Sequence, residues 1–453
     1  MQKSSPPAES SVSTRWGDFV ARSQWCDVPA SVRHEAKRSI LNMVGTSLGA
    51  AKHSEIESLA RLLRDVAGPP QACVIGRVER FDCLSAAFIN AVSANLFDFD
   101  DTHLGTVIHP SAPVAPPLLA LGEQRGSSGA EILHAFVLGV EIECRLGNAV
   151  SPAHYARGCH ITATCGVFGA AAASAKLIGL NAAATAHAIG MAASQSAGIA
   201  ESLATGAKNV GIGNCARNGL FAALLAQTGY TAAPRAIEGV QGWAHALSDA
   251  LNLNALLIRL GETWELTRNA CKPYPCGIVL HAVIDAAFEL RNTYALAAAD
   301  IAAVTVTGNA LLLARADRDV ANERDAKISI QHSAAAVFVF GAAGMREYSD
   351  AAVMDPSAVE FRRRVQAEID PALPIGAARM SVRTIGGKDF TAQVMHARGS
   401  LEQPMTDSDI EQKVRQLASI GFPACDIDRV IDAVWELDRA DDVRSLLRLL
   451  AAA

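Results

Sequence analysis

The longest apolar run in the chain, CGVFGAAAASAKLIGL at residues 165–180, limits the fold most strongly. A helix that crosses a membrane needs about 20 apolar residues, whereas this run is shorter and contains Lys176. Alanine and glycine dominate it, and such small side chains let neighbouring helices approach closely. The run therefore predicts a buried helix in a tightly packed helical domain rather than a membrane span.

Composition agrees with a globular protein. Half of the 453 residues are hydrophobic, 19% are charged and the net charge is −6, which argues against disorder. No long basic run is present, so we expect no nucleic-acid partner. The ten cysteines include no C-x-x-C pair, and residues 1–16 lack the apolar segment of a secretory signal. We therefore expect reduced thiols, a cytoplasmic location and no membrane contact.

The periodicity of apolar residues divides the chain into helical and mixed parts. Strand-like alternation appears at 300–310, and residues 378–399 indicate a hairpin around Gly386 and Gly387,. Residues 329–344, 357–369 and 406–452 are expected to be helical. Further helical windows lie at 16–51, 54–67, 83–97, 111–125, 128–151, 162–178, 181–198, 215–229 and 244–252.

These patterns predict a mainly α protein with two domains. A large all-helical domain is expected from 1–266 together with 399–453, and a smaller α+β domain from 267–398,. GTSLG at 45–49 matches a serine-hydrolase motif, but Ser47 lies inside a helical pattern instead of after a strand,. No glycine-rich nucleotide-binding signature follows a strand.

Four segments place charged or imidazole groups beside glycine or proline in apolar surroundings. Each has an ordinary structural explanation: a helix cap for the aspartates, a hydrogen-bonded core histidine, or a solvated loop lysine. The lysine of the third segment is expected in a glycine-rich turn before a helix. The segments are DFDDTHLGTVIHPS (98–111, with Asp98, Asp100, Asp101, Thr102, His103 and His109), HYARGCHITATCG (154–166, with His160), GAKNVGIGNCARNG (206–219, with Lys208) and CKPYPCG (271–277, with Lys272).

Taken together, the four segments indicate acid–base chemistry on a carboxylate-bearing substrate. Lysine is a compact charge that suits carboxylates, and histidine can give and take protons near neutral pH while a nearby aspartate fixes its tautomer. Cationic groups stabilise the negative charge that builds up on substrate oxygens. Carboxylates and imidazoles could instead bind a metal, but the spacing matches no metal motif, so we expect neither metal nor cofactor.

The four segments in this order resemble the MmgE/PrpD family, whose known members include 2-methylcitrate dehydratase, cis-aconitate decarboxylase and iminodisuccinate epimerase. The resemblance covers nearly the whole chain. It implies a helical domain built from both ends of the chain, a smaller α+β lid domain and a homodimer. The tyrosine that the decarboxylase branch carries before its lid helix has no counterpart in residues 311–331.

The resemblance also implies roles for the site residues. It assigns His109 and His160 as the acid–base pair, with Asp98 and Thr102 orienting the imidazole. Substrate carboxylates would be bound by Lys208 and Lys272. We also expect His103 and Asp101, from the first segment, to bind substrate.

The resulting hypothesis is a cofactor-independent lyase, either a dehydratase or a decarboxylase, that acts on a small di- or tricarboxylate such as 2-methylcitrate or cis-aconitate. One alternative is an epimerase or isomerase of an iminodisuccinate-like dicarboxylate, because the same residues could exchange a proton on opposite faces of one carbon. The other alternative is a non-catalytic homologue that only binds carboxylates.

Overall fold

A computed structural model describes residues 11–452, so the first ten residues of the N-terminal segment considered above lie outside the described part. Contacts between Cα atoms divide the chain into two compact units. Of the described residues, the first unit comprises 11–96, 100–269 and 407–452, and the second comprises 97–99 and 270–406. The sequence-based boundaries at 266 and 398 remain predictions beside these divisions.

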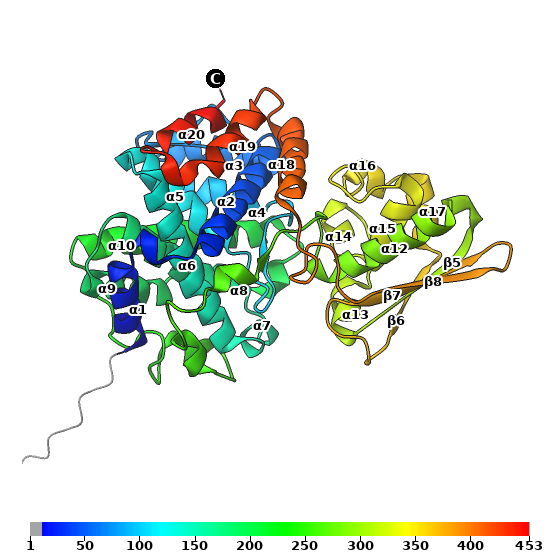
Figure 1. The fold of residues 1–453 in the computed structure, drawn as a ribbon, viewed down its shortest axis with the longest axis horizontal. Helices are drawn as coiled ribbons and strands as arrows, with labels where there is room; N and C mark the ends of the chain where they lie inside the picture. Colours follow the sequence, from blue (N-terminus) through cyan, green and yellow to red (C-terminus); the bar gives the residue numbers. More distant parts are fainter. Residues whose placement is uncertain (1–10, 453) are drawn as a thin grey trace, which may run out of the picture. The chain divides into compact units, whose positions relative to one another are not determined.

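The first unit is helical, as predicted (Figure 1). Its short strands are β1 (Ala72–Cys73), β2 (Arg80–Phe81) and β3 (Thr102–His103), and β4 (Asn269–Ala270) stands where the chain passes to the second unit. Its helices are α1 (Val12–Arg22), α2 (Ala30–Ala50), α3 (Ser54–Val66), α4 (Cys83–Asn95), α5 (Ser111–Arg125), α6 (Gly129–Val150), α7 (Ala153–Ala156), α8 (Ile161–Leu177), α9 (Ala182–Ala193), α10 (Gly206–Gln227), α11 (Trp243–Leu247), α18 (Asp407–Gly421), α19 (Ile427–Trp435) and α20 (Arg444–Leu450).

Helix α8, which contains most of the longest apolar run, is the central helix of this unit. Every residue from Ile161 to Ala175 is buried, and α8 packs against α5, α6, α9 and α10. Its crossing with α6 depends on two glycines: a Cβ at Gly139 would lie 2.7 Å from the Gly169 carbonyl oxygen. The small residues therefore serve helix–helix contact, which confirms the prediction of a buried helix.

Segments from both ends of the chain lie side by side in the first unit. Helices α18 and α19 pack on α2, and α20 packs on α5 (Figure 1). A Cβ at Gly45 of α2 would lie 2.6 Å from a methyl group of Val414 on α18. Among residues 11–452, no helix is both long and apolar enough to cross a membrane.

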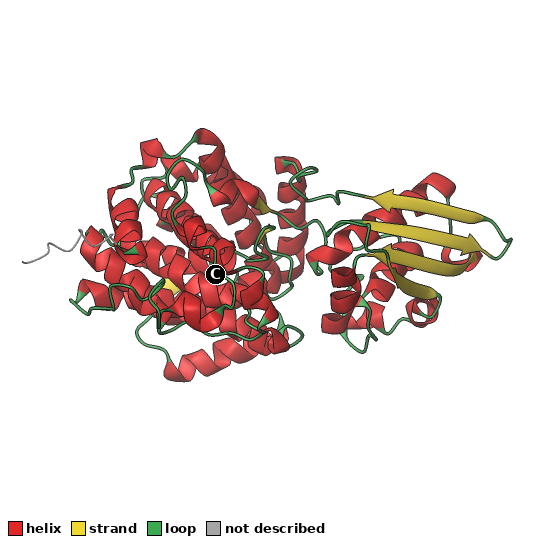
Figure 2. Cartoon of the chain, turned by 90° about the horizontal axis from the view of Figure 1, so that it is seen from below, coloured by secondary structure: helices red, strands yellow, loops and turns green. Residues whose placement is uncertain are grey.

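The second unit is the α+β part of the protein. Its four-stranded sheet has the order β6-β5-β7-β8, in which only the β5–β6 pair is parallel (Figure 2). Helix α12 packs on β7 and β8, whereas α13 and α15 contact the β5–β6 side of the sheet. The elements are α12 (His281–Tyr294), β5 (Ile301–Gly308), α13 (Ala310–Ala316), α14 (Glu323–Ala326), α15 (Ile330–Ala335), η7 (Ala336–Phe340), α16 (Asp350–Val353), α17 (Pro356–Arg362), β6 (Val365–Ile369), β7 (Ala378–Thr384) and β8 (Asp389–Val394).

Two helix predictions were wrong. Residues 357–369 do not form one helix, because α17 ends at Arg362 and 365–369 pair with β5 as an edge strand; this tertiary pairing overrides the local pattern. Helix α10 begins at Gly206, and not near 215. Gly213, interpreted as a turn signal, lies inside α10, where a Cβ would meet Phe88 of α4 at 2.7 Å.

Candidate functional site

The loop between α4 and α5 is held by a buried carboxylate at its centre. Asp101 is fully buried; the Ser111 hydroxyl and the Asn269 amide both donate to its Oδ2 at 2.5 Å. Burial raises the pKa of Asp101 to about 6, although these hydrogen bonds act in the opposite direction. Asp101 therefore fixes the start of α5, and its oxygens face protein donors.

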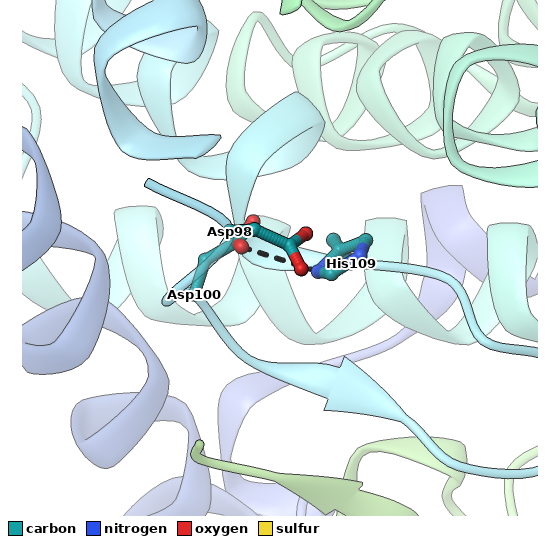
Figure 3. A group of neighbouring side chains, drawn as sticks. All are labelled: Asp98, Asp100 and His109. Carbon is teal, nitrogen blue, oxygen red and sulfur yellow. Dashed lines mark ion pairs between the residues drawn. The ribbon is translucent and has the colours of Figure 1, made fainter. Parts of the chain in front are cut away.

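His109 lies at the end of this loop with one ring nitrogen turned toward the protein. Its Nδ1 is 3.0 Å from the Asp101 carbonyl oxygen and 3.1 Å from Asp100 Oδ1. Figure 3 shows this ion pair with Asp98 of the same loop. Thr102 Oγ1 is 3.5 Å from Nδ1, and the His109 amide donates to Thr162 of α8. Both close contacts are acceptors, so Nδ1 carries the proton and Nε2 is the basic nitrogen.

His160 and Lys208 line the same cavity. The cavity has a volume of about 290 Å³ and is bounded by the start of α8, residues 195–202 and one side of α10. His160 precedes α8 and is 4% exposed, and its amide donates to the Gly198 carbonyl. Lys208 is in the first turn of α10 and is 7% exposed. Other polar side chains at the cavity are Gln195, Ser202, Asn214, Arg217 and Asn218.

His103, from the same loop as His109, is engaged on both ring nitrogens. Nδ1 is 2.8 Å from Thr106 Oγ1 and Nε2 is 3.1 Å from Glu265 Oε2, and the side chain is fully buried. Burial by itself would raise the pKa of Glu265, but the hydrogen bond and charge of His103, together with a hydrogen bond from Asn148 and the charge of Arg268, outweigh it and lower this pKa to about 2. The Glu265 amide donates to Glu141, which pairs with Arg145 at 2.6 Å.

Asp98 and Lys272 form a pair within the second unit. Lys272 Nζ lies 3.0 Å from Asp98 Oδ2 and 2.9 Å from the Asp98 carbonyl oxygen, and its side chain is 2% exposed. Asp98 adopts a positive φ of 55°, a conformation that aspartate tolerates better than most residues. The pair neutralises a deeply buried ammonium group, so the lysine of CKPYPCG is not a solvated loop lysine.

Asp98, Asp100 and His109 also offer oxygen and nitrogen atoms of the kind that bind metal ions,. His109 presents its Nδ1 to this group and to the Asp101 carbonyl. Nδ1 donates its proton to the carbonyl oxygen, so a cation could bind Nδ1 only in the other tautomer. Metal binding and this hydrogen bond therefore exclude each other, and a test of metal dependence distinguishes them.

Sequence reasoning did not single out Glu265 and Asn269, which hold the loop. Asp100 was among the polar residues of the first segment, and its Oδ1 lies 3.1 Å from His109 Nδ1. A larger hollow of about 700 Å³ between α1 and residues 257–264 contains none of the predicted site residues. Polar residues within largely apolar helices, such as Asn95 and Asn209, are the sequence signal that could have pointed to further residues holding the loop.

Comparison with known proteins identifies the class. Residues 14–255 match the MmgE/PrpD N-terminal domain and residues 274–437 match the MmgE/PrpD C-terminal domain. The chain therefore belongs to the MmgE/PrpD family, and the resemblance inferred from the four segments is confirmed.

The chain is also similar to curated proteins over nearly its whole length. It is 26% identical to a cis-aconitate decarboxylase-like protein (oryM) of Aspergillus oryzae, over 98% of both chains. It is 28% identical to cis-aconitate decarboxylase of Homo sapiens, over 92% of this chain and 90% of the other. It is 25% identical to cis-aconitate decarboxylase of Aspergillus terreus, over 99% of this chain and 98% of the other.

Proposed function

We propose that the protein is a lyase of the MmgE/PrpD family that acts on a small tricarboxylate, with cis-aconitate as the first substrate to test. The observation that carries the proposal is the shared cavity: His160, able to move a proton, and Lys208, able to hold a carboxylate, face the same space of about 290 Å³. Relatives named cis-aconitate decarboxylase support the tricarboxylate class.

The chemistry follows from the protonation of the groups. In a decarboxylation, the bond between a carboxyl carbon and the substrate skeleton breaks, CO2 leaves, and the electron pair spreads onto the remaining unsaturated carboxylate. Lys208 would stabilise that negative charge, and a histidine would deliver a proton to carbon to give an unsaturated dicarboxylate. In a dehydration, one histidine would remove a proton from carbon while the other protonates the departing hydroxyl.

The two histidines are proposed to have different tasks. His109 is held with Nε2 as its basic nitrogen, because Nδ1 faces the Asp101 carbonyl and Asp100; we assign it general-base or general-acid function. His160 is assigned as the second proton-transfer group, since it lines the cavity with Lys208. Thr102, beside His109 Nδ1, is proposed to help orient the ring.

The remaining predicted residues are given supporting tasks. Lys272 and Asp98 are proposed to work as a pair in which Asp98 holds the ammonium group until a substrate carboxylate takes its place. Asp101 and His103 have their polar atoms directed to protein partners, so we now propose that they position the loop rather than contact substrate. The homodimer and the cytoplasmic location also remain proposals.

Proton NMR of the purified protein in D2O tests the function. The panel is cis-aconitate, citrate, 2-methylcitrate and iminodisuccinate, and we expect cis-aconitate to be consumed with formation of a decarboxylated product. The reaction should be lost in His160→Ala. New vinylic signals from citrate or 2-methylcitrate would indicate dehydration instead. Solvent deuterium in recovered substrate with inversion and no new product would contradict the lyase, as would carboxylate binding without turnover.

A further inference from the structure

Two buried asparagines connect helix α10 to His109 through an unbroken series of contacts. Asn209 is the residue after Lys208, and its Nδ2 donates to the Asn95 carbonyl oxygen at 3.0 Å and to Asn95 Oδ1 at 3.1 Å. Asn95 is the last residue of α4, and its Nδ2 donates to Asp100 Oδ2 at 2.7 Å. The other oxygen of Asp100 is 3.1 Å from His109 Nδ1. The series therefore runs from α10 through α4 to the imidazole.

The direction of each hydrogen bond is fixed by chemistry. The Asp100 carboxylate can only accept, so Asn95 must turn its NH2 group toward it. That leaves Asn95 Oδ1 as an acceptor, which requires Asn209 to present its NH2 group. All four side chains are buried: Asn95 and Asp100 are 0% exposed, Asn209 is 1% exposed and His109 is 9% exposed. In such surroundings an amide without its partner is costly, so the arrangement is strongly preferred over its flipped alternatives.

We propose that Asn95 and Asn209 are positioning residues that hold the Asp100 carboxylate against His109 Nδ1. The inference rests on the proposed function in one respect, namely that His109 transfers the proton. The Asp101 carbonyl oxygen accepts the Nδ1 proton, and the negative charge of Asp100, 3.1 Å from Nδ1, favours the same tautomer and makes Nε2 more basic,. Since Asn209 adjoins Lys208, the same series fixes the carboxylate-binding end of α10 relative to the proton-transfer group.

The series explains why polar residues stand at these two positions. Asn95 ends a helix whose residues from Ala86 onward are all buried, and Asn209 lies beside Lys208 on a helix that packs against α4. An apolar residue of similar size at either position would fill the space and remove an amide from the interior. Such a substitution would leave the Asp100 carboxylate without a fixed orientation, and the His109 imidazole would lose its orientation as a result.

The test compares Asn209→Leu and Asn209→Asp with the matched control Asn90→Leu in the full-length protein. Asn90 is also a buried asparagine of α4, but it bonds the backbone of Cys73 and Ile75, away from the loop. Asn209→Asp preserves the shape of the side chain and removes both of its donors, so it separates hydrogen bonding from volume. It also provides a second variant if Asn209→Leu folds poorly.

The first readout is the tautomer of His109, measured by 15N NMR of histidine-labelled, ligand-free protein, with the signal assigned by its loss in His109→Gln. In wild type we expect the proton on Nδ1. Both Asn209 variants should move the signal toward a mixture of tautomers, and Asn90→Leu should leave it unchanged even if its melting temperature falls. The second readout is turnover of cis-aconitate, in which the Asn209 variants should lower kcat roughly tenfold while KM changes less than twofold.

An unchanged His109 tautomer in both Asn209 variants would overturn the proposal, whatever happens to turnover. Equal losses of kcat in the Asn209 variants and in Asn90→Leu would also overturn it, because they would show a general effect on the fold. The tautomer measurement needs no substrate. If no member of the carboxylate panel is turned over, the proposed function fails while the positioning series is still decided by the NMR signal.

Discussion

His103 and His109 stand six residues apart in one loop and are buried to a similar degree, yet their surroundings differ. His103 has both ring nitrogens engaged, by Thr106 and Glu265. His109 directs Nδ1 to the Asp101 carbonyl and to Asp100, which leaves Nε2 as its basic nitrogen. The comparison teaches that two histidines of one segment can differ in the partners of their ring nitrogens, which is the basis for proposing a structural role for His103 and a proton-transfer role for His109.

The largest expected effect is on turnover when His109 is changed. His109→Gln should lower kcat on the true substrate by roughly 10²–10⁴-fold, because a positioned proton-transfer group is lost. Steady-state kinetics measure the loss, and the melting temperature serves as the control. Full activity in a folded His109→Gln protein would remove His109 from the mechanism and erase the contrast with His103.

His103 should behave in the opposite way, with a large effect on stability. His103→Leu leaves Glu265 buried beside a residue that cannot pair with it, and we expect a loss of about 3 kcal/mol in the free energy of unfolding. Urea denaturation at pH 7 measures it, while kcat of the folded fraction should stay close to wild type. A stable His103→Leu protein with strongly reduced kcat would assign His103 to the reaction.

The same pair makes a prediction about pH. The pKa of Glu265 is lowered from 4.5 to about 2 in the fold, so its contribution to stability is present above pH 4.5 and is lost as the pH falls toward 2. The stability difference between wild type and His103→Leu should therefore shrink over that range. A constant difference from pH 7 to pH 2 would show that packing, and not the ion pair, accounts for the loss.

The effect of pH on the contribution of Asp101 to stability is opposite to that of Glu265, because burial raises the pKa of Asp101 from 3.8 to about 6. A raised carboxyl pKa means that the fold favours the protonated form, so this contribution is present below about pH 4 and is lost as the pH rises through about 6. In Asp101→Asn, the fall in the free energy of unfolding between pH 4 and pH 7 should be smaller than in wild type by on the order of 2 kcal/mol. Parallel profiles for the two proteins between pH 4 and pH 7 would contradict this account of the loop.

The smallest expected effect is that of metal removal. Asp98, Asp100 and His109 could ligate a cation, but the Nδ1–H tautomer of His109 suits a proton-transfer group instead. Dialysis against EDTA should change kcat less than twofold. A loss of activity that a divalent cation restores would make His109 a ligand and would replace the proposed contrast between the two histidines.

Much of the candidate site could be predicted from the sequence, because its residues gather in short segments beside glycine and proline. His160 and Lys208 were selected from different segments, and the structure places both at one cavity. The first two turns of α10 were missed because glycines often mark turns. In this helix Gly213 instead allows close packing against α4. Asp100 was among the candidate groups of the first segment, but only the structure shows that its Oδ1 lies 3.1 Å from His109 Nδ1.

By itself, the sequence determined the helical architecture, the α+β second part and the family, because periodicity, small-residue runs and motifs are local properties of the chain. Only the tertiary structure decided the tasks of the polar side chains. Asn209 meets Asn95, and His103 meets Glu265, across 114 and 162 positions of the chain. Which partner faces which ring nitrogen depends on helix packing, and this is why the sequence could not distinguish the surroundings of His103 from those of His109.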